Sequence, residues 1–377
     1  MSDLDEIPQA DQIEGAPHPR DTLELFGQAN AEAAFLDAYT QDHLHHGWLV
    51  TGPRGVGKAT LVWRIVRFLM AQPPKGGMFD VPLATTLNSD PNHAAARQIM
   101  SLAHPGVYLC RRPWDEKAKR LKTVITVEEV RGLKSFFNLS STDGGWRVAI
   151  IDAAEDMNPS AANAVLKVLE EPPARTLLFL ISHQPARLLP TIRSRCRELR
   201  CKTLSPDDLA QSIAAAGFEV PADQAQALAE LSGGSAGQAI GLLANGGIEI
   251  YDQIIGLLRS APRISRPRIL ALADKCAGRD GAAYYDMVVQ LSALALARLA
   301  RQGAIGGEMA RAAPAEAEVA ARFASNPHQA RIWADLLQEL TGRTAHARAV
   351  NLDPGQVILD MFLKIDAAAG RATLLSA

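Results

Sequence analysis

The sequence has few residues of the kinds that support a disulfide scaffold, a cysteine metal site or a membrane segment. It contains four cysteines in 377 residues, widely separated and without a C-x-x-C pair, which argues against a disulfide framework and against a zinc site made of cysteines. The longest apolar run, Met287 to Ala297, is about half the length that spans a bilayer. The first twenty residues are acidic and polar, unlike a signal peptide, so we expect a cytoplasmic protein.

Aromatic residues and net charge are also scarce. Aromatics make up 5% of the chain, and the formal net charge is −2. This balance gives no global attraction to nucleic acid or to a membrane, so any DNA contact must come from a local basic patch. The chain is instead long and rich in alanine and leucine. At 377 residues it is too long for one compact core, and its composition favours helices.

Apolar runs of strand length alternate with helical patterns up to about residue 202. Residues 48–50, 146–152 and 176–182 predict buried strands. Residues 59–70 predict a helix, and a second helix is predicted to begin at Pro159, with Asn158 as its N-cap. Helices placed between buried strands indicate a parallel sheet, which binds ligands at the carboxyl ends of its strands.

Strand patterns stop after Ser205–Pro206, and three short helical patterns follow before longer helices begin near residue 250. The predicted fold is therefore α/β plus all-α. Its predicted segments are a disordered N-terminal segment at 1–20, an α/β domain at 21–203, a small three-helix domain at 204–248 and a helical C-terminal domain at 249–377.

A phosphate-binding loop follows the first strand. The stretch from Gly52 to Lys58 reads G-x-x-x-x-G-K, in which glycines let backbone N–H groups face an anion and the lysine reaches the terminal phosphates. The next residue normally supplies a hydroxyl to Mg²⁺, but here it is Ala59. Thr60 is one position further, about 100° around the helix. The predicted nucleotide-binding residues of this loop are Gly52, Gly55, Gly57, Lys58, Ala59 and Thr60.

Hydrolysis of ATP needs an acid for Mg²⁺ and a second acid that orients water. Asp152 ends a buried strand and fits the first role, so it joins the predicted nucleotide-binding residues. The position beside it is Ala153, whose methyl group cannot orient water. Glu155 and Asp156 follow, and we expect them to be solvated acids of a turn. The sequence therefore predicts a site that does not turn over ATP.

Two stretches resemble a known family. "AANAVLKVLEEPP" (161–173) and "LLFLISHQPARLLPTIRSRC" (177–196) are similar to the clamp-loader subunits of bacterial DNA polymerase III, which are AAA+ proteins, and the similarity runs from about residue 24 to 245. The resemblance implies a RecA-like P-loop domain, a helical lid and a helical collar used for oligomerisation. It also implies a cytoplasmic hetero-oligomer with motor (gamma/tau) and delta subunits as partners. It further implies that the sliding clamp and primed DNA are contacted through the assembly, and we expect no membrane partner.

Three departures separate this chain from the motor subunits. Ala59 replaces the hydroxyl residue, Ala153 replaces the glutamate, and Gly237 replaces the lid arginine that touches nucleotide in the motor. Together they favour the delta-prime branch, which implies a non-catalytic subunit of the polymerase assembly. Whether ATP binds without hydrolysis stays open, and Mg²⁺ is not favoured.

Other residues gain a role only through the resemblance. It implies that Arg195, in the "SRC" triplet, is an arginine finger for a neighbouring subunit's ATP. It places Ser182 where the family senses phosphate, although the residue also suits a strand cap. The family's four-cysteine zinc module is absent before His104–Pro105, so no zinc is expected. The basic stretch 111–122 suits either DNA contact or a solvated loop, and we favour the loop.

Three alternatives remain from the sequence. The first is an active clamp-loader motor, against which Ala153 and Gly237 argue. The second is a stand-alone P-loop NTPase, which would need a separate substrate pocket. The third is a structural adaptor whose glycine loop no longer binds nucleotide.

Overall fold

The structure, a computed structural model, describes residues 8–13, 15–72, 84–138, 145–278, 281–307 and 309–375. The chain forms two compact units. Unit 1 comprises Met1–Glu219 with Gly234–Gln238, and unit 2 comprises Val220–Gly233 with Ala239–Ala377. The stretch predicted as a lid, 204–248, is divided between them, and the predicted domain boundaries stay predictions.

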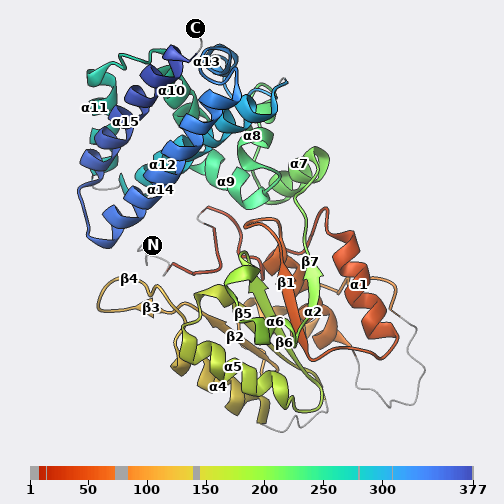
Figure 1. Ribbon diagram of the computed structural model, residues 1–377. Helices are drawn as coiled ribbons and strands as arrows, with labels where there is room; N and C mark the ends of the chain where they lie inside the picture. Colours follow the sequence, from red (N-terminus) through yellow and green to blue (C-terminus); the bar gives the residue numbers. More distant parts are fainter. Residues whose placement is uncertain are drawn as a thin grey trace, which may run out of the picture. The chain divides into compact units, whose positions relative to one another are not determined.

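Unit 1 contains a parallel sheet with the strand order β2-β5-β6-β1-β7 (Figure 1). The strands are β1 (Gly47–Thr51), β2 (Val107–Arg111), β5 (Arg147–Asp152), β6 (Thr176–Ser182) and β7 (Arg197–Arg200). The insertion of β6 between β1 and β5 is the RecA-like arrangement, so the predicted fold class is confirmed.

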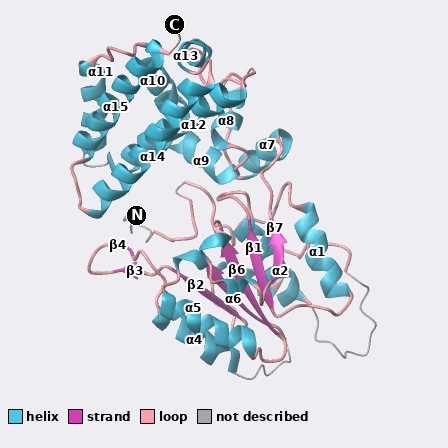
Figure 2. Cartoon of the chain, in the orientation of Figure 1, coloured by secondary structure: helices cyan, strands magenta, loops and turns pink. Residues whose placement is uncertain are grey.

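Helices cover both faces of this sheet (Figure 2). One face packs against α1 and α2 around Phe35 and Trp63, and the other packs against α4 and α5 around Val165. The helices of unit 1 are α1 (Ala29–Thr40), α2 (Lys58–Ala71), α3 (Ala94–Met100), α4 (Val127–Asn138), α5 (Pro159–Glu170), α6 (Pro190–Arg193) and α7 (Pro206–Ala215), with short 3-10 turns η1 (Ala154–Asp156) and η2 (Pro185–Arg187). A small antiparallel hairpin, β3 (Trp114–Asp115) with β4 (Arg120–Leu121), follows β2.

The predicted helix starts are confirmed by their caps. The Asn158 side chain accepts the N–H of Ala161 at 2.8 Å, and Pro159 is the first residue of α5. Ser205 caps α7 in the same way by accepting the N–H of Asp208. These side chains satisfy N–H groups that have no partner inside the helix.

Part of the N-terminal stretch makes polar contacts. The prediction that 1–20 is disordered includes residues 1–7 and 14, which lie outside the described residues, and it stays a prediction; the described residues 8–13 and 15–20 have polar partners. The Asp11 carboxylate pairs with Arg111 and with His18 at 3.2 Å, and the side chains of Asp11 and His18 are 1% and 2% exposed. The ion pair of Asp11 with Arg111 of β2 therefore connects the described part of this stretch to the sheet.

Unit 2 is helical, as predicted. It contains α8 (Ala225–Ser232), most of α9 (Ala236–Ala244), α10 (Gly247–Arg259), α11 (Arg266–Ala277), α12 (Gly281–Ile305), α13 (Glu316–Phe323), α14 (Pro327–Ala349) and α15 (Pro354–Leu374). None of the described helices combines the length and the apolar composition that a membrane span requires.

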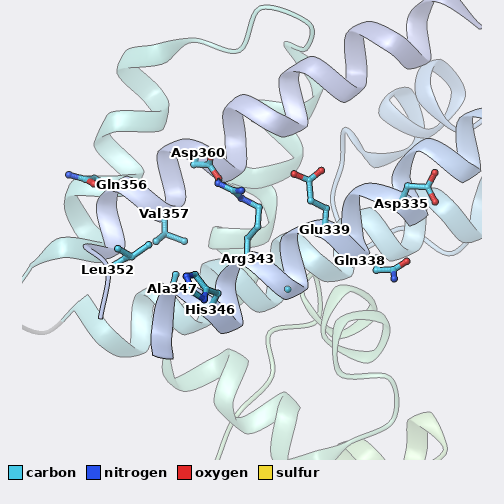
Figure 3. Close-up of a pocket in the computed structure, with 11 residues that line it drawn as sticks. Asp335, Gln338, Glu339, Arg343, His346, Ala347, Leu352, Gln356, Val357 and Asp360 are labelled. Atoms are coloured by element: carbon cyan, nitrogen blue, oxygen red, sulfur yellow. Dashed lines mark hydrogen bonds and ion pairs between the residues drawn. The ribbon is translucent and has the colours of Figure 1, made fainter. Parts of the chain in front are cut away.

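A pocket of about 800 Å³ lies along α14 and the first half of α15 (Figure 3). Charged side chains on its walls are already paired: Arg343 contacts Asp360 at 2.9 Å, and Lys364 beside it contacts Glu339 at 2.6 Å. These contacts are surface ion pairs, which contribute little to stability.

A buried polar cluster joins α10, α12 and α13 in unit 2. The Arg298 Nε lies 2.6 Å from the Glu316 carboxylate, and the Tyr251 hydroxyl donates to the same carboxylate at 2.8 Å. Glu316 is 6% exposed, so its charge depends on these partners. Burial and the Glu316 charge raise the pKa of Tyr251, which keeps the phenol neutral.

We predict that Glu316→Ala destabilises unit 2 by about 3–5 kcal/mol, because it leaves the buried Arg298 charge without its main partner. Hydrogen exchange of peptides from α10 and α12 measures this loss. Glu318→Ala is the matched control on the same helix, since its partner Arg259 is exposed and the loss is about 0–1 kcal/mol. Equal exchange in the two variants would contradict the prediction.

Candidate nucleotide-binding site

The glycine loop connects the carboxyl end of β1 to α2, as the sequence predicts. Gly52, Gly55 and Gly57 have positive φ angles of 140°, 78° and 97°, a region that side chains rarely adopt. A Cβ on Gly52 would also collide with the backbone of Cys201 beyond β7. Glycine is therefore required by the path of the loop, and Lys58 then opens α2.

Lys58 lies folded inside the loop. Its Nζ donates to the carbonyl oxygens of Gly52 at 2.8 Å and Pro53 at 2.5 Å, and the side chain is 3% exposed. Burial lowers the pKa of Lys58 to about 8, although the nearby Asp152 charge opposes this shift. A bound phosphate would offer the ammonium group stronger, charged acceptors than these carbonyls.

Two further predicted residues lie at the same edge of the sheet. Ser182 pairs in register with Thr51 of β1, and Asp152 pairs with Ile181 of β6. The Ser182 hydroxyl is fully buried and accepts the N–H of Gln184 at 3.2 Å, so it caps its own turn. A role in sensing phosphate stays a prediction.

Asp152 is buried at the end of β5, with 8% of its surface exposed. Burial raises the pKa of its carboxyl to about 7, the Asp11 charge adds to the rise, and Lys58 opposes it. Asp11 belongs to the N-terminal segment, and no sequence pattern predicted that this segment lies near Asp152. The Asp152 carboxyl is therefore far less acidic than an exposed aspartate.

The two acids that follow Ala153 are half-buried and have protein partners, which corrects the expectation of freely solvated turn acids. The Glu155 Oε1 accepts the backbone N–H groups of His183 and Gln184 at 2.9 and 3.1 Å. Asp156 lies 3.0 Å from the Arg112 Nε. The 3-10 turn η1 directs Glu155 toward the end of β6. Its hydrogen bonds therefore connect the segment after β5 to the segment after β6.

His183 is a site residue that the sequence did not single out. Burial, followed by the Lys58 charge, lowers its pKa to about 4, so the imidazole is neutral. Its Nδ1 is buried without a hydrogen-bond partner among the described residues. The available signal was its position directly after the buried strand β6, where parallel sheets place ligand contacts.

The segment 234–238 closes onto the loop within unit 1. The Gly237 N–H donates to the Gly55 carbonyl at 2.9 Å, and the Ser235 hydroxyl donates to the Arg54 carbonyl at 2.8 Å. A Cβ on Gly237 would lie 2.9 Å from the Gly55 Cα and against Ile13 of the N-terminal segment. A longer residue at 237 would therefore displace one of these neighbours.

These residues fit a phosphate group better than a magnesium ion. Glycine backbone, a helix N-terminus and Lys58 are together the elements of an anion site. For Mg²⁺ the Asp152 carboxyl lies at the end of β5, but the Ala59 side chain carries no oxygen. Among the described residues no cluster of three His, Cys, Asp or Glu side chains is arranged for a metal.

Arg195 is not part of this group. It follows α6 and precedes β7, and its carbonyl lies against Gly47 at the start of β1. Its guanidinium lies 3.0 Å from Glu170 at the end of α5 and donates to the Thr191 carbonyl at 3.1 Å. The side chain is 39% exposed. Arg195 therefore lies at the amino edge of the sheet, and the glycine loop at the carboxyl edge.

The fold and the loop define a RecA-like P-loop domain. Residues 27–205 match the family model described as "DNA polymerase III, delta subunit". The predicted resemblance to the delta-prime branch is confirmed by curated relatives named "DNA polymerase III subunit delta'". The protein from Pseudomonas aeruginosa is 35% identical over 50% of this chain and 53% of its own length. The protein from Escherichia coli is 32% identical over 54% and 56%.

A DNA polymerase III gamma subunit from Buchnera aphidicola is also similar, at 26% identity over 51% of this chain and 47% of its own length. The chain thus spans about half the length of the curated relatives it matches. The family model matches residues 27–205, which lie in unit 1.

We predict that Asp152→Asn changes the pH dependence of stability. With a pKa near 7 when folded and about 3.9 when unfolded, Asp152 holds its proton longer in the folded protein. Its contribution to stability is therefore present at low pH and lost as the pH rises from about 4 to 7. As the pH rises from about 4 to 7, the free energy of unfolding of Asp152→Asn should increase by about 2–4 kcal/mol relative to that of the wild type.

Urea unfolding at pH 4.5 and 7.5 measures this difference. Asp37→Asn, an exposed change on α1, is the control and should follow the wild type. A constant difference between Asp152→Asn and wild type at both pH values would show that the carboxyl is not perturbed.

Proposed function

We propose that this chain is a delta-prime-like subunit of the DNA polymerase III clamp loader. In this role it takes part in loading the sliding clamp on primed DNA without hydrolysing ATP. The observation that carries the proposal is the separation of Arg195 from the glycine loop of the same chain. The similarity to delta-prime subunits over the P-loop region supports it.

The absence of hydrolysis follows from the positions that a motor needs. Ala59 supplies no hydroxyl for Mg²⁺, and Ala153 supplies no carboxylate for water. Glu155 is an alternative base, but one of its oxygens already accepts two backbone N–H groups. Gly237 offers no charge to a nucleotide and instead contacts the loop backbone.

Arg195 lies at the amino edge of the sheet, whereas the glycine loop of the same chain lies at the carboxyl edge. In this proposal Arg195 therefore acts on a nucleotide bound to a neighbouring subunit. The five residues of β1 separate the two edges, which corresponds to about 16 Å of extended strand. The exposed guanidinium is held by Glu170 and can reach a partner surface. An arginine placed in this way stabilises charge on a transferring phosphoryl group. We propose the motor (gamma/tau) and delta subunits as the partners, with the clamp and primed DNA contacted through the assembly.

We predict that Arg195→Ala slows ATP turnover by the motor site that this arginine completes by about 10³-fold or more. The measurement is clamp- and DNA-stimulated ATPase activity of the complex reconstituted with motor and delta subunits. Arg193→Ala is the matched control, since Arg193 is an exposed arginine two positions away. Assembly is checked by gel filtration of both variants.

If Arg195→Ala leaves turnover unchanged in a fully assembled complex, the finger role is wrong. If this chain hydrolyses ATP alone and Glu155→Gln abolishes that activity, the chain is an active motor instead.

We propose that ATP binds weakly, because the Gly52 and Pro53 carbonyl oxygens compete with its phosphates for the Lys58 ammonium group and the N-terminal segment lies beside the loop. Asp11 places a negative charge near Asp152, and Ile13 lies against Gly237 beside the loop. Displacing the N-terminal segment costs free energy, and this cost lowers the apparent affinity for ATP.

We predict that Asp11→Ala raises ATP affinity several-fold, since it removes both the anchor of the segment and a repelling charge. Calorimetric titration with ATP, with and without Mg²⁺, measures this, and Mg²⁺ should change the affinity little. Glu24→Ala, an exposed acid of the same region, should bind as wild type, and Lys58→Ala should not bind. Loss of affinity in Asp11→Ala would contradict this account.

A further inference from the structure

The β3–β4 hairpin is a feature of unit 1 that the proposed nucleotide chemistry does not use. The chain leaves β2 at Arg111, turns at Pro113 and forms two short antiparallel strands in which Trp114 pairs with Leu121. The Lys122 N–H closes the base of the hairpin by donating to the Pro113 carbonyl at 2.9 Å. The sequence suggested a solvated loop for 111–122, whereas the structure gives it a defined shape.

The hairpin carries concentrated positive charge. Residues 111–122 contain six lysines and arginines and two acids, Asp115 and Glu116. Asp115 stabilises the turn of the hairpin, because its carboxylate accepts the N–H groups of Lys117 and Ala118 at 2.9 Å. Glu116 pairs with Lys119 at 3.5 Å, with both side chains more than two-thirds exposed. The remaining exposed cations, which form no ion pair with a described residue, are Lys117, Arg120 and Lys122.

A pocket of about 670 Å³ lies beside the stem of the hairpin. Its apolar wall is formed by Trp114, Tyr108 and Leu121. The Tyr108 hydroxyl donates to the Glu129 carbonyl at 2.7 Å, which fixes one edge of the ring. Flat aromatic side chains of this kind offer a stacking surface for a nucleobase.

Three arginines line the same pocket, and the contacts of each with described residues involve only some of its N–H groups. Arg112 faces Asp156 through Nε, and Arg111 faces Gln9 and Asp11 through Nη1. Arg20 uses Nε and Nη1 for the Met100 carbonyl and Gln9. Since a guanidinium group has five N–H donors, the pocket combines an aromatic wall with donors suited to phosphate or base edges.

We propose that the hairpin and its pocket bind single-stranded nucleic acid. Lys117, Arg120 and Lys122 contact backbone phosphates, and Trp114 stacks on one unpaired base in the pocket. The inference depends on residues outside the glycine loop and Arg195, so it stands or fails separately from the proposed function. If both hold, the hairpin gives the subunit its own contact with the unpaired strand next to a primer.

A single strand fits these observations better than a duplex or a free nucleotide. A base inside a duplex is stacked on its neighbours and cannot enter a pocket beside Trp114. A free nucleotide could enter, but it would not extend to cations on the tip and the opposite face of the hairpin. Trp114 and Leu121 line the pocket, and strand alternation directs Arg120 and Lys122 away from it.

Fluorescence anisotropy with a labelled oligo(dT) strand tests the proposal on the full chain. The first variant is Lys117→Ala/Arg120→Ala/Lys122→Ala, and its charge-matched control is Arg97→Ala/Lys134→Ala/Lys167→Ala, three exposed cations of α3, α4 and α5. We expect the hairpin variant to lose at least tenfold in affinity. The slope of log K against log salt should fall by about 2, since each phosphate contact contributes about 0.7.

The second variant, Trp114→Leu, keeps an apolar side chain in the pocket and removes the stacking surface. We expect about a five- to a hundredfold loss for the single strand, as is usual for removal of a stacked base, with no change in salt slope. Circular dichroism confirms that each variant is folded.

Three results would overturn the proposal. The first is equal binding by the hairpin variant and its control. The second is a duplex of the same length bound as tightly as the single strand and unaffected by Trp114→Leu. The third is full displacement of the strand by thymidine monophosphate at the concentration of the strand's own nucleotides, which would assign the pocket to a free nucleotide.

Discussion

The direction of the parallel sheet is the constraint on which this account depends. In a parallel sheet every strand ends at the same edge, so the loops at the two edges lie a full strand length apart. β1, β5 and β6 bring the glycine loop, Asp152 and Ser182 together at the carboxyl edge. The loop before β7 puts Arg195 at the amino edge, beside the beginning of β1. The glycine loop and Arg195 of one chain are therefore too far apart to contact the same phosphate.

At the carboxyl edge the loop is held by contacts within the protein. Lys58 bonds to two carbonyls of its own loop, and Gly237 bonds to Gly55. The N-terminal segment adds the Asp11 charge near Asp152, which helps to keep that carboxyl a weak acid. A site arranged in this way retains the shape of a nucleotide site while it lacks the groups that activate water. This arrangement agrees with the proposal that Arg195 acts at the site of a neighbouring subunit.

Much of the fold and of the loop could be predicted from the sequence, because the signals are local. Buried strands appear as continuous apolar runs, and Asn158 and Ser205 with their following prolines mark helix starts. Strand β7 was missed because three of its four residues are charged and exposed and only Leu199 is buried. Its pairing with β1 decides its conformation, and pairing is not visible in a short polar run.

The missed parts of the site depend on contacts between residues far apart in the chain. Asp11 is ordered by Arg111, a hundred positions away, and nothing in an acidic N-terminal stretch indicates that partner. Glu155 was expected to be solvated because it follows a strand end, but the η1 turn directs it to the N–H groups after β6. His183 gained its depressed pKa from burial in the fold. Sequence patterns indicate the helices and strands, whereas the contacts between distant side chains depend on the folded sheet.

Single-turnover ATP hydrolysis by the purified chain, without motor subunits, tests the central claim most directly. The chain is placed in excess over radiolabelled ATP, with Mg²⁺ and primed DNA, so that even one slow turnover is counted. The account predicts phosphate release no faster than in buffer alone, together with retained binding that requires Lys58. Release well above that background, lost in Lys58→Ala, would contradict the account and would mean that this site carries a base of its own.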